Sequence, residues 1–333
     1  MPDIQGHVIV VILLAVAFDF INGFHDAANA IATSVSTRVL SPRQAIIMSA
    51  CMNLVGALLG TAVAKTIGSG IVDPSAVTLN TIIAALLSAI AWNILTWYLA
   101  LPTSSSHALI ASVIGASVAT SGSFNVLKWK GINKVLDGLI FSPGVGFLVG
   151  FLLMVLLMWM LRRTAPSVVS KRFKKWQIFS AAFMAFSHGG NDAQKTMGII
   201  TMALVSAGYL TSFNVPMWVV LLCAMTMAAG TAGGGWRIIK TLGMKLAHLK
   251  PVHGFAAETA AATVIEIASR MGLPLSTTHV ISSTIMGVGA SKRFSAVKWG
   301  IGGNIVMAWV LTLPACAGMA WLIYKAMMLF LHP

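Results

Sequence analysis

The sequence predicts an all-α polytopic membrane protein built from two inverted-topology repeats. Of its 333 residues, 57% are hydrophobic and only 9% are charged, and the mean hydropathy is +0.87. A soluble protein of this size carries about 25% charged residues. Apolar stretches of about 20 residues, the length that spans a bilayer core, recur from end to end. Several motifs of the first half also return in the same order in the second half.

The internal duplication rests on four matched pairs of motifs. LPTSSSH (101–107) returns as LPLSTTH (273–279), and HDAAN (25–29) aligns with NDAQK (191–195). Gly60-Thr61 matches Gly230-Thr231, and Lys128-Trp129 matches Lys298-Trp299, at nearly the same offset. We therefore predict a first transmembrane repeat over 1–161, a basic linker over 162–175 and a second transmembrane repeat over 176–333.

Each repeat is predicted to hold about five hydrophobic segments. They lie near 8–34, 44–66, 77–99, 103–121 and 139–161 in the first repeat, and near 177–205, 216–236, 252–271, 276–290 and 300–326 in the second. An odd number of crossings places the two copies upside down relative to each other, a common plan of secondary transporters. Alternatively, the fourth segment of each repeat belongs to a re-entrant helical hairpin, which changes the number of crossings.

The charge distribution orients this bundle. The linker RRTAPSVVSKRFKK holds six basic and no acidic residues between two apolar spans, so the positive-inside rule places it in the cytoplasm of a cell with the protein in its plasma or inner membrane. Lys128, Lys130 and Lys134 then fall on the outer side, against the rule. The net charge of +14 is concentrated in such loops, and we expect the lipid bilayer, not nucleic acid, as the partner.

Polar residues inside the apolar segments are the first candidate site. Asp19, Asn22, Asp26 and Asn29 share one helix face, because their spacing is i, i+3, i+7 and i+10. In the second copy His188, Asp192 and Lys195 recur at i, i+4 and i+7. An ionisable group at mid-membrane costs about 2.5–3.5 kcal/mol, which favours a functional role. The structural alternative is that these groups pair with one another or cap breaks in the helices.

The repeated Ser/Thr runs are the second candidate site. A proline followed by hydroxyl residues and an apolar stretch is a helix-start signal. Two such starts inside the membrane would aim free N–H groups and hydroxyls at a tetrahedral oxyanion. The residues concerned are Ser104, Ser105, Ser106, Ser276, Thr277 and Thr278. The alternative for each motif is an ordinary capped helix at the membrane surface.

Three further groups are candidates for a proton relay: His25, Glu258 and Glu266. The two glutamates lie eight residues apart, on one face of the third segment of the second repeat. Pairing with Arg270 is the alternative for Glu266. No HExxH motif, clustered Cys/His spacing or nucleotide-binding GxxxxGK[ST] motif occurs, so we expect neither an enzyme nor a resident metal or cofactor.

With these residues assembled, the chain resembles the inorganic phosphate transporter (PiT) family over nearly its whole length. The resemblance rests on NGFHDAANAIAT (22–33) and FSHGGNDAQKTMG (186–198), while GTAGGGWRIIKT and LPLSTTHVISS favour the bacterial low-affinity phosphate permease branch. It implies that Asp26, Asn29, Asn191 and Asp192 hold a coupling cation, and that the Ser/Thr runs together with Gln194 bind phosphate. His25 stands where eukaryotic relatives have Asn, which leaves sodium and protons both open.

The resulting prediction is a secondary active transporter that imports inorganic phosphate by proton or sodium symport and alternating access. A divalent metal travelling with phosphate is a variant of the same mechanism. The alternatives are a permease for sulfate or another oxyanion, and a phosphate-selective channel or sensor. The sequence leaves the assembly open, with a homodimer among the alternatives.

Overall fold

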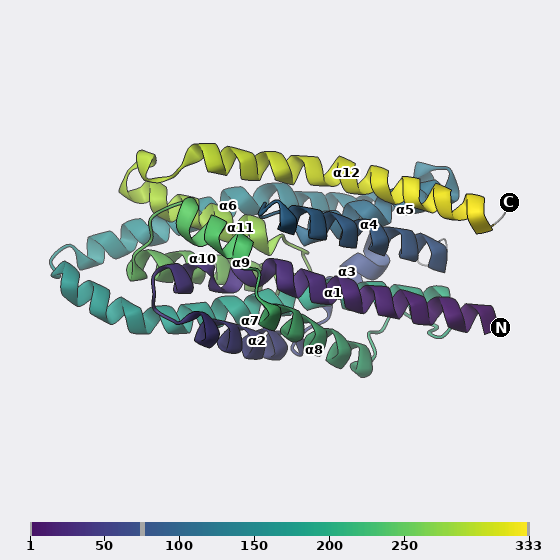
Figure 1. Cartoon of the computed structure of the whole chain (residues 1–333), viewed down its shortest axis with the longest axis horizontal. Coiled ribbons are helices and arrows are strands. Elements are labelled where there is room, and N and C mark those ends of the chain that lie inside the picture. Colours follow the sequence, from purple (N-terminus) through teal and green to yellow (C-terminus); the bar gives the residue numbers. More distant parts are fainter. Residues whose placement is uncertain (1, 74–76, 332–333) are drawn as a thin grey trace.

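The computed structural model describes residues 2–73 and 77–331, and within them the chain is a bundle of helices. Most helices run along the long axis of the molecule (Figure 1). The N- and C-terminus lie together at one end, and the turn between α6 and α7 lies at the opposite end (Figure 1). Four helices are long and apolar enough to cross a membrane, and two bent helix pairs raise the number to six. This confirms the prediction of an all-α polytopic membrane protein.

The order of the elements is the same in the two halves. The first half contains α1 (Pro2–Ser36), α2 (Pro42–Ala57), α3 (Ala62–Gly70), α4 (Leu79–Tyr98), α5 (Ser105–Ser121), η2 (Phe124–Val126) and α6 (Trp129–Leu161). The second half contains α7 (Pro166–Ser206), α8 (Met217–Gly233), α9 (Trp236–Lys240) with η3 (Thr241–Lys245), α10 (Pro251–Arg270), α11 (Thr277–Lys292), η4 (Phe294–Ala296) and α12 (Trp299–Leu331). The inverted orientation of the copies stays a prediction.

Matching local features accompany this matching order. An isolated β-bridge joins Val72 to Leu127 in the first half, and another joins Ala247 to Val297 in the second. The last helix of each half contains one proline, Pro143 in α6 and Pro314 in α12. The halves also interlock, because α6 packs on α11 while α12 packs on α5.

The structure differs from the sequence prediction at three boundaries. The second segment of each repeat is a pair of helices bent by 68° (α2 and α3) or 61° (α8 and α9–η3), instead of one straight helix. Helix α6 begins at Trp129, ten residues before the expected start. Helix α7 begins at Pro166 inside the predicted linker, because proline at the first helical position is preorganised for a helix. The non-helical part of the linker is therefore a short turn.

Helices α5 and α11 place the site. They have 17 and 16 residues, at or just below the shortest length that crosses a bilayer core, and each follows a longer helix, α4 or α10. Both start in the interior of the bundle: Ser104, Ser105, Ser276 and Thr277 are buried. Their positions fit the predicted arms of re-entrant hairpins.

Candidate functional site

The two Ser/Thr runs begin helices in the interior, as their sequence predicts. Ser104 has extended backbone angles, and its side chain accepts a hydrogen bond from the His107 N–H at 3.1 Å. Ser276 does the same for His279 at 3.2 Å. The partial positive charge of both helix starts therefore lies inside the protein, away from bulk water.

The carboxylate of Asp26 lies against both helix starts. The Ser105 hydroxyl donates to Oδ2 at 2.9 Å and the Thr278 hydroxyl to Oδ1 at 3.4 Å. His25 Nδ1 lies 2.7 Å from Oδ1 of the same carboxylate. All these side chains are buried. One acidic residue of α1 thus contacts hydroxyls at the starts of both α5 and α11.

Asp192 of α7 has a comparable position with different partners. Its Oδ1 lies 2.7 Å from Lys195 Nζ and accepts a hydrogen bond from the Asn191 amide at 2.8 Å. The Thr277 hydroxyl donates to Oδ2 at 3.4 Å. Asp192 and Lys195 are both fully buried, so this ion pair is shielded from solvent.

The two asparagines of the duplicated signature also contact the second Ser/Thr run, residues 273–279. The Asn29 amide donates to Thr277 at 3.2 Å and to Thr278 at 2.9 Å. The Asn191 amide donates to the Leu275 carbonyl at 3.1 Å, and the Ser106 hydroxyl donates to the same carbonyl at 3.0 Å. The structure therefore brings the residues predicted for the cation and those predicted for phosphate into one buried hydrogen-bond network.

A candidate cation site lies within this network. Ligand atoms of Asp26, His188 and Asp192 all lie within 4.8 Å of one another. Two carboxylates and an imidazole offer oxygen and nitrogen donors for a small cation. His188 Nδ1 lies 3.2 Å from Asn53 Oδ1, which orients the ring.

Sequence reasoning placed His188 and Lys195 on the polar face of Asp192 without a specific role, and it did not single out Asn53. The spacing of His188, Asp192 and Lys195 signals that His188 and Lys195 share a helix face with the acid, but Asn53 lies in α2 without any motif. It reaches the site because α2 packs closely on α7: a Cβ on Gly190 would lie 3.2 Å from the Gly56 carbonyl. Only the packing of these helices identifies it.

Gln194 and Glu266 lie apart from this network. Gln194 accepts hydrogen bonds at 2.8 and 3.3 Å from the N–H groups of Val63 and Ala64, at the start of α3. Glu266 pairs with Arg270 at 2.7 Å, at a site where Arg270 is largely exposed. Gln194, Glu266 and Arg270 line one cavity of about 510 Å³. Glu266 therefore forms the ion pair with Arg270 that was the alternative to a proton relay.

Glu258 is buried and satisfied by neutral donors. The hydroxyls of Thr33 and Ser180 donate to it at 2.5 Å each, and the Gln177 amide donates at 3.0 Å. Thr33 follows Asn29 by one helical turn on α1, so Glu258 lies further along the helix that carries Asp26. No basic side chain of the described residues pairs with it.

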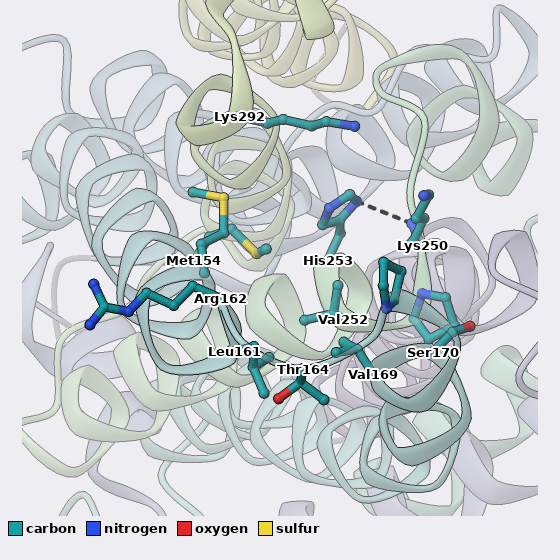
Figure 2. Close-up of a pocket in the computed structure, with 13 residues that line it drawn as sticks. Met154, Leu161, Arg162, Thr164, Val169, Ser170, Lys250, Val252, His253 and Lys292 are labelled. Atoms are coloured by element: carbon teal, nitrogen blue, oxygen red, sulfur yellow. Dashed lines mark hydrogen bonds between the residues drawn. The ribbon is translucent and has the colours of Figure 1, made fainter.

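A separate cavity of about 600 Å³ lies at the other end of α10. Its basic side chains are those of Arg162, Lys250, His253 and Lys292 (Figure 2). Its remaining walls are mostly apolar, with Met154, Leu161, Val169 and Val252 among them (Figure 2). None of the site residues predicted from the sequence lines it.

Comparison with known proteins then assigns the chain. The model of the phosphate transporter family matches residues 22–320. The chain belongs to the phosphate transporter family. A probable low-affinity inorganic phosphate transporter of Rhizobium meliloti is 50% identical over 317 residues, 95% of each chain. One from Bacillus subtilis is 49% identical over 319 residues, 95% of this chain and 96% of the other.

The fold has a counterpart among solved structures. A structure of a sodium-dependent phosphate transporter superposes with a TM-score of 0.88, covering 97% of this chain and 99% of the other at 23% identity. The family and the apolar helices identify an integral membrane protein. The similar proteins are transporters, which confirms the prediction that this chain is not an enzyme.

Proposed function

We propose that this member of the phosphate transporter family imports inorganic phosphate by cation symport with alternating access. The observation that carries the proposal is the meeting of two helix starts with two buried carboxylates. Ser105 of α5 and Thr278 of α11 donate to Asp26, and Thr277 of α11 donates to Asp192. Residues suited to an anion and residues suited to a cation thus share one enclosed network.

The electrical work of import explains why a cation is needed. Moving one charge through 100 mV is worth about 2.3 kcal/mol, so a phosphate dianion entering an inside-negative cell faces about 4.6 kcal/mol per 100 mV. At least two positive charges must accompany each dianion to make import electrically neutral. A pore without this coupling would let phosphate leak outward.

The geometry suggests how binding of the two ions is coupled. Asp26 and Asp192 accept hydrogen bonds from the hydroxyls that phosphate would use. Their negative charges would also repel a phosphate dianion bound beside them. Lys195 already pairs with Asp192, so a cation held by Asp26, His188 and Asp192 would neutralise the remaining negative charge and free the Ser/Thr hydroxyls. Phosphate would then bind at the starts of α5 and α11, beside the cation.

Roles and orientation complete the proposal. Asp26, Asn29, Asn191 and Asp192 serve the cation, whereas the Ser/Thr runs serve phosphate. Gln194, which lines the neighbouring cavity, is placed on the phosphate route. We assign the basic linker to the cytoplasm because it carries the largest basic cluster. The termini, which lie at the opposite end of the bundle (Figure 1), would then face outward.

Uptake of radiolabelled phosphate into proteoliposomes tests the proposal, with proton and sodium gradients imposed separately and excess unlabelled sulfate as competitor. Uptake that requires a cation gradient and ignores sulfate is the expected result. Uptake of sulfate but not phosphate would make the protein an oxyanion permease of different specificity. Flux without saturation or counterflow would identify a channel.

The cation role has its own test. Asp26→Asn and Asp192→Asn should each abolish uptake while the protein still reaches the membrane. Asp137→Asn, an acid of α6 outside the network, is the matched control and should transport normally. Full transport by both Asp26→Asn and Asp192→Asn would refute the role.

A further inference from the structure

A second basic cavity lies beside the cavity of Gln194, at the end of the molecule away from the linker. It has a volume of about 760 Å³. Its walls come from α3, from the start of α6 and from the end of α10. The basic residues that line it are Lys65, Lys128, Lys130, Lys134 and Arg270, and no acidic residue is among its described lining residues. We call this cavity the lysine vestibule.

The vestibule adjoins the Gln194 cavity. Ala62 and Arg270 line both spaces, so the two are neighbours with a shared wall. Arg270 is 78% exposed and pairs with Glu266, which is 20% exposed. An anion that left the vestibule along this wall would reach Gln194 next.

The positive charge of the vestibule is only partly neutralised. Lys128 Nζ lies 4.0 Å from Asp73, and both side chains are about half exposed. Lys134 donates to the Met271 carbonyl at 3.3 Å, a neutral partner. Lys65 and Lys130 are exposed and form no ion pair with the described residues. An anion can approach them directly.

Two physical rules disfavour lysines at this place. Lys130 lies in the first turn of α6, where the partial positive charge of the helix start disfavours cations, and Lys134 follows it by one turn. They also lie at the end opposite the basic linker, where the positive-inside rule expects few basic residues. Lysines at positions that these rules disfavour indicate a functional role.

The internal duplication provides a comparison within the same chain. Lys128-Trp129 at the start of α6 corresponds to Lys298-Trp299 at the start of α12. At the same spacing, Lys130 corresponds to Gly300 and Lys134 to Asn304. The helix start therefore forms without these two charges in the other copy. Lys130 and Lys134 are particular to the vestibule and not to the fold.

We propose that the lysine vestibule is an outer capture site for phosphate, which concentrates the anion before it passes Arg270 and Gln194. The proposal rests on phosphate import as the function and on the linker being cytoplasmic. A cavity lined by one sign of charge raises the local concentration and the association rate of an oppositely charged ligand. This effect falls with ionic strength, because salt screens exposed charges.

The test is phosphate uptake by intact cells that lack other phosphate transporters. Lys65→Gln combined with Lys130→Gln should raise KM about three- to tenfold at low ionic strength, leave the maximal rate unchanged and lose the KM difference at high salt. Lys250→Gln combined with Lys292→Gln removes two lysines from the cavity of Figure 2, at the opposite end. This control should leave KM unchanged.

Several results would overturn the proposal. These are an unchanged KM at low salt, an equal shift in the control, or a fall in the maximal rate alone. Lys65→Arg with Lys130→Arg must restore the wild-type KM, which separates charge from folding. Lys130→Cys must react with a membrane-impermeant maleimide added outside the cells, above the background of wild type. Failure of wild type itself to take up phosphate would instead refute the proposed function.

Discussion

Loss of one partner from the buried Asp192–Lys195 pair should destabilise the protein strongly. The two charged atoms lie 2.7 Å apart, and both side chains have no exposed surface. At an effective dielectric constant of about 20, their attraction is about 6 kcal/mol, and most of it offsets the loss of hydration. Lys195 Nζ has no hydrogen-bond partner other than this carboxylate among the described residues. Asp192→Asn therefore leaves an uncompensated buried ammonium, at a cost of about 3–5 kcal/mol.

The assay is the free energy of unfolding in mixed micelles with increasing SDS. Asp192→Asn should lose about 3–5 kcal/mol. The double variant Asp192→Asn/Lys195→Met removes both charges and should be more stable than the single variant. Arg270→Met is the matched control, because Arg270 and Glu266 also lie 2.7 Å apart but Arg270 is 78% exposed. It should lose at most about 1 kcal/mol.

Two outcomes would refute this reasoning. If Asp192→Asn lost no more than Arg270→Met, burial would not set the strength of the pair. If the double variant were no more stable than Asp192→Asn, the unpaired ammonium would not be the cause. Uptake distinguishes stability from transport, since the double variant should remain inactive although it regains stability.

Three further predictions concern packing and helix ends. Gly150→Ala should destabilise the protein in the same SDS titration, because its new Cβ would lie 2.8 Å from a backbone carbonyl of α11. In the control Gly144→Ala the new Cβ has nothing within 4 Å, so this variant should be neutral or slightly stabilising. Equal effects of the two substitutions would contradict the close packing of α6 on α11. Ser276→Ala removes the cap of α11 and should cost about 1 kcal/mol and raise KM for phosphate, and an unchanged KM would remove this helix start from the site. Glu258→Gln should lose more stability than Glu266→Gln, because the Glu258 carboxylate accepts three hydrogen bonds and the NH2 group of a glutamine would face one of these donors. A larger loss for Glu266→Gln would contradict the importance of this network.

The sequence alone determined that the fold consists of membrane helices, and it identified the residues of the candidate site. Hydropathy required membrane helices, because a backbone in lipid must satisfy its own hydrogen bonds. The matched motifs revealed the duplication, and Pro with Ser/Thr marked the starts of α5 and α11. Asp26, Asn29, Asn191 and Asp192 stood out because polar residues are rare in apolar segments. All of these signals are local in the chain.

Tertiary structure alone decided which residues meet. Asn29 donates a hydrogen bond to Thr278 although 249 positions separate the two residues, and no spacing along the chain predicts that contact. The partner of Lys195, the bend between α2 and α3 and the place of Asn53 also follow from helices packing across the two halves. The lysines at the start of α6, which the positive-inside rule does not explain, are likewise brought together with others only by the fold. Only the fold gathers Lys65, Lys130 and Arg270 around one cavity beside Gln194, because α3, α6 and α10 come together there from distant parts of the chain.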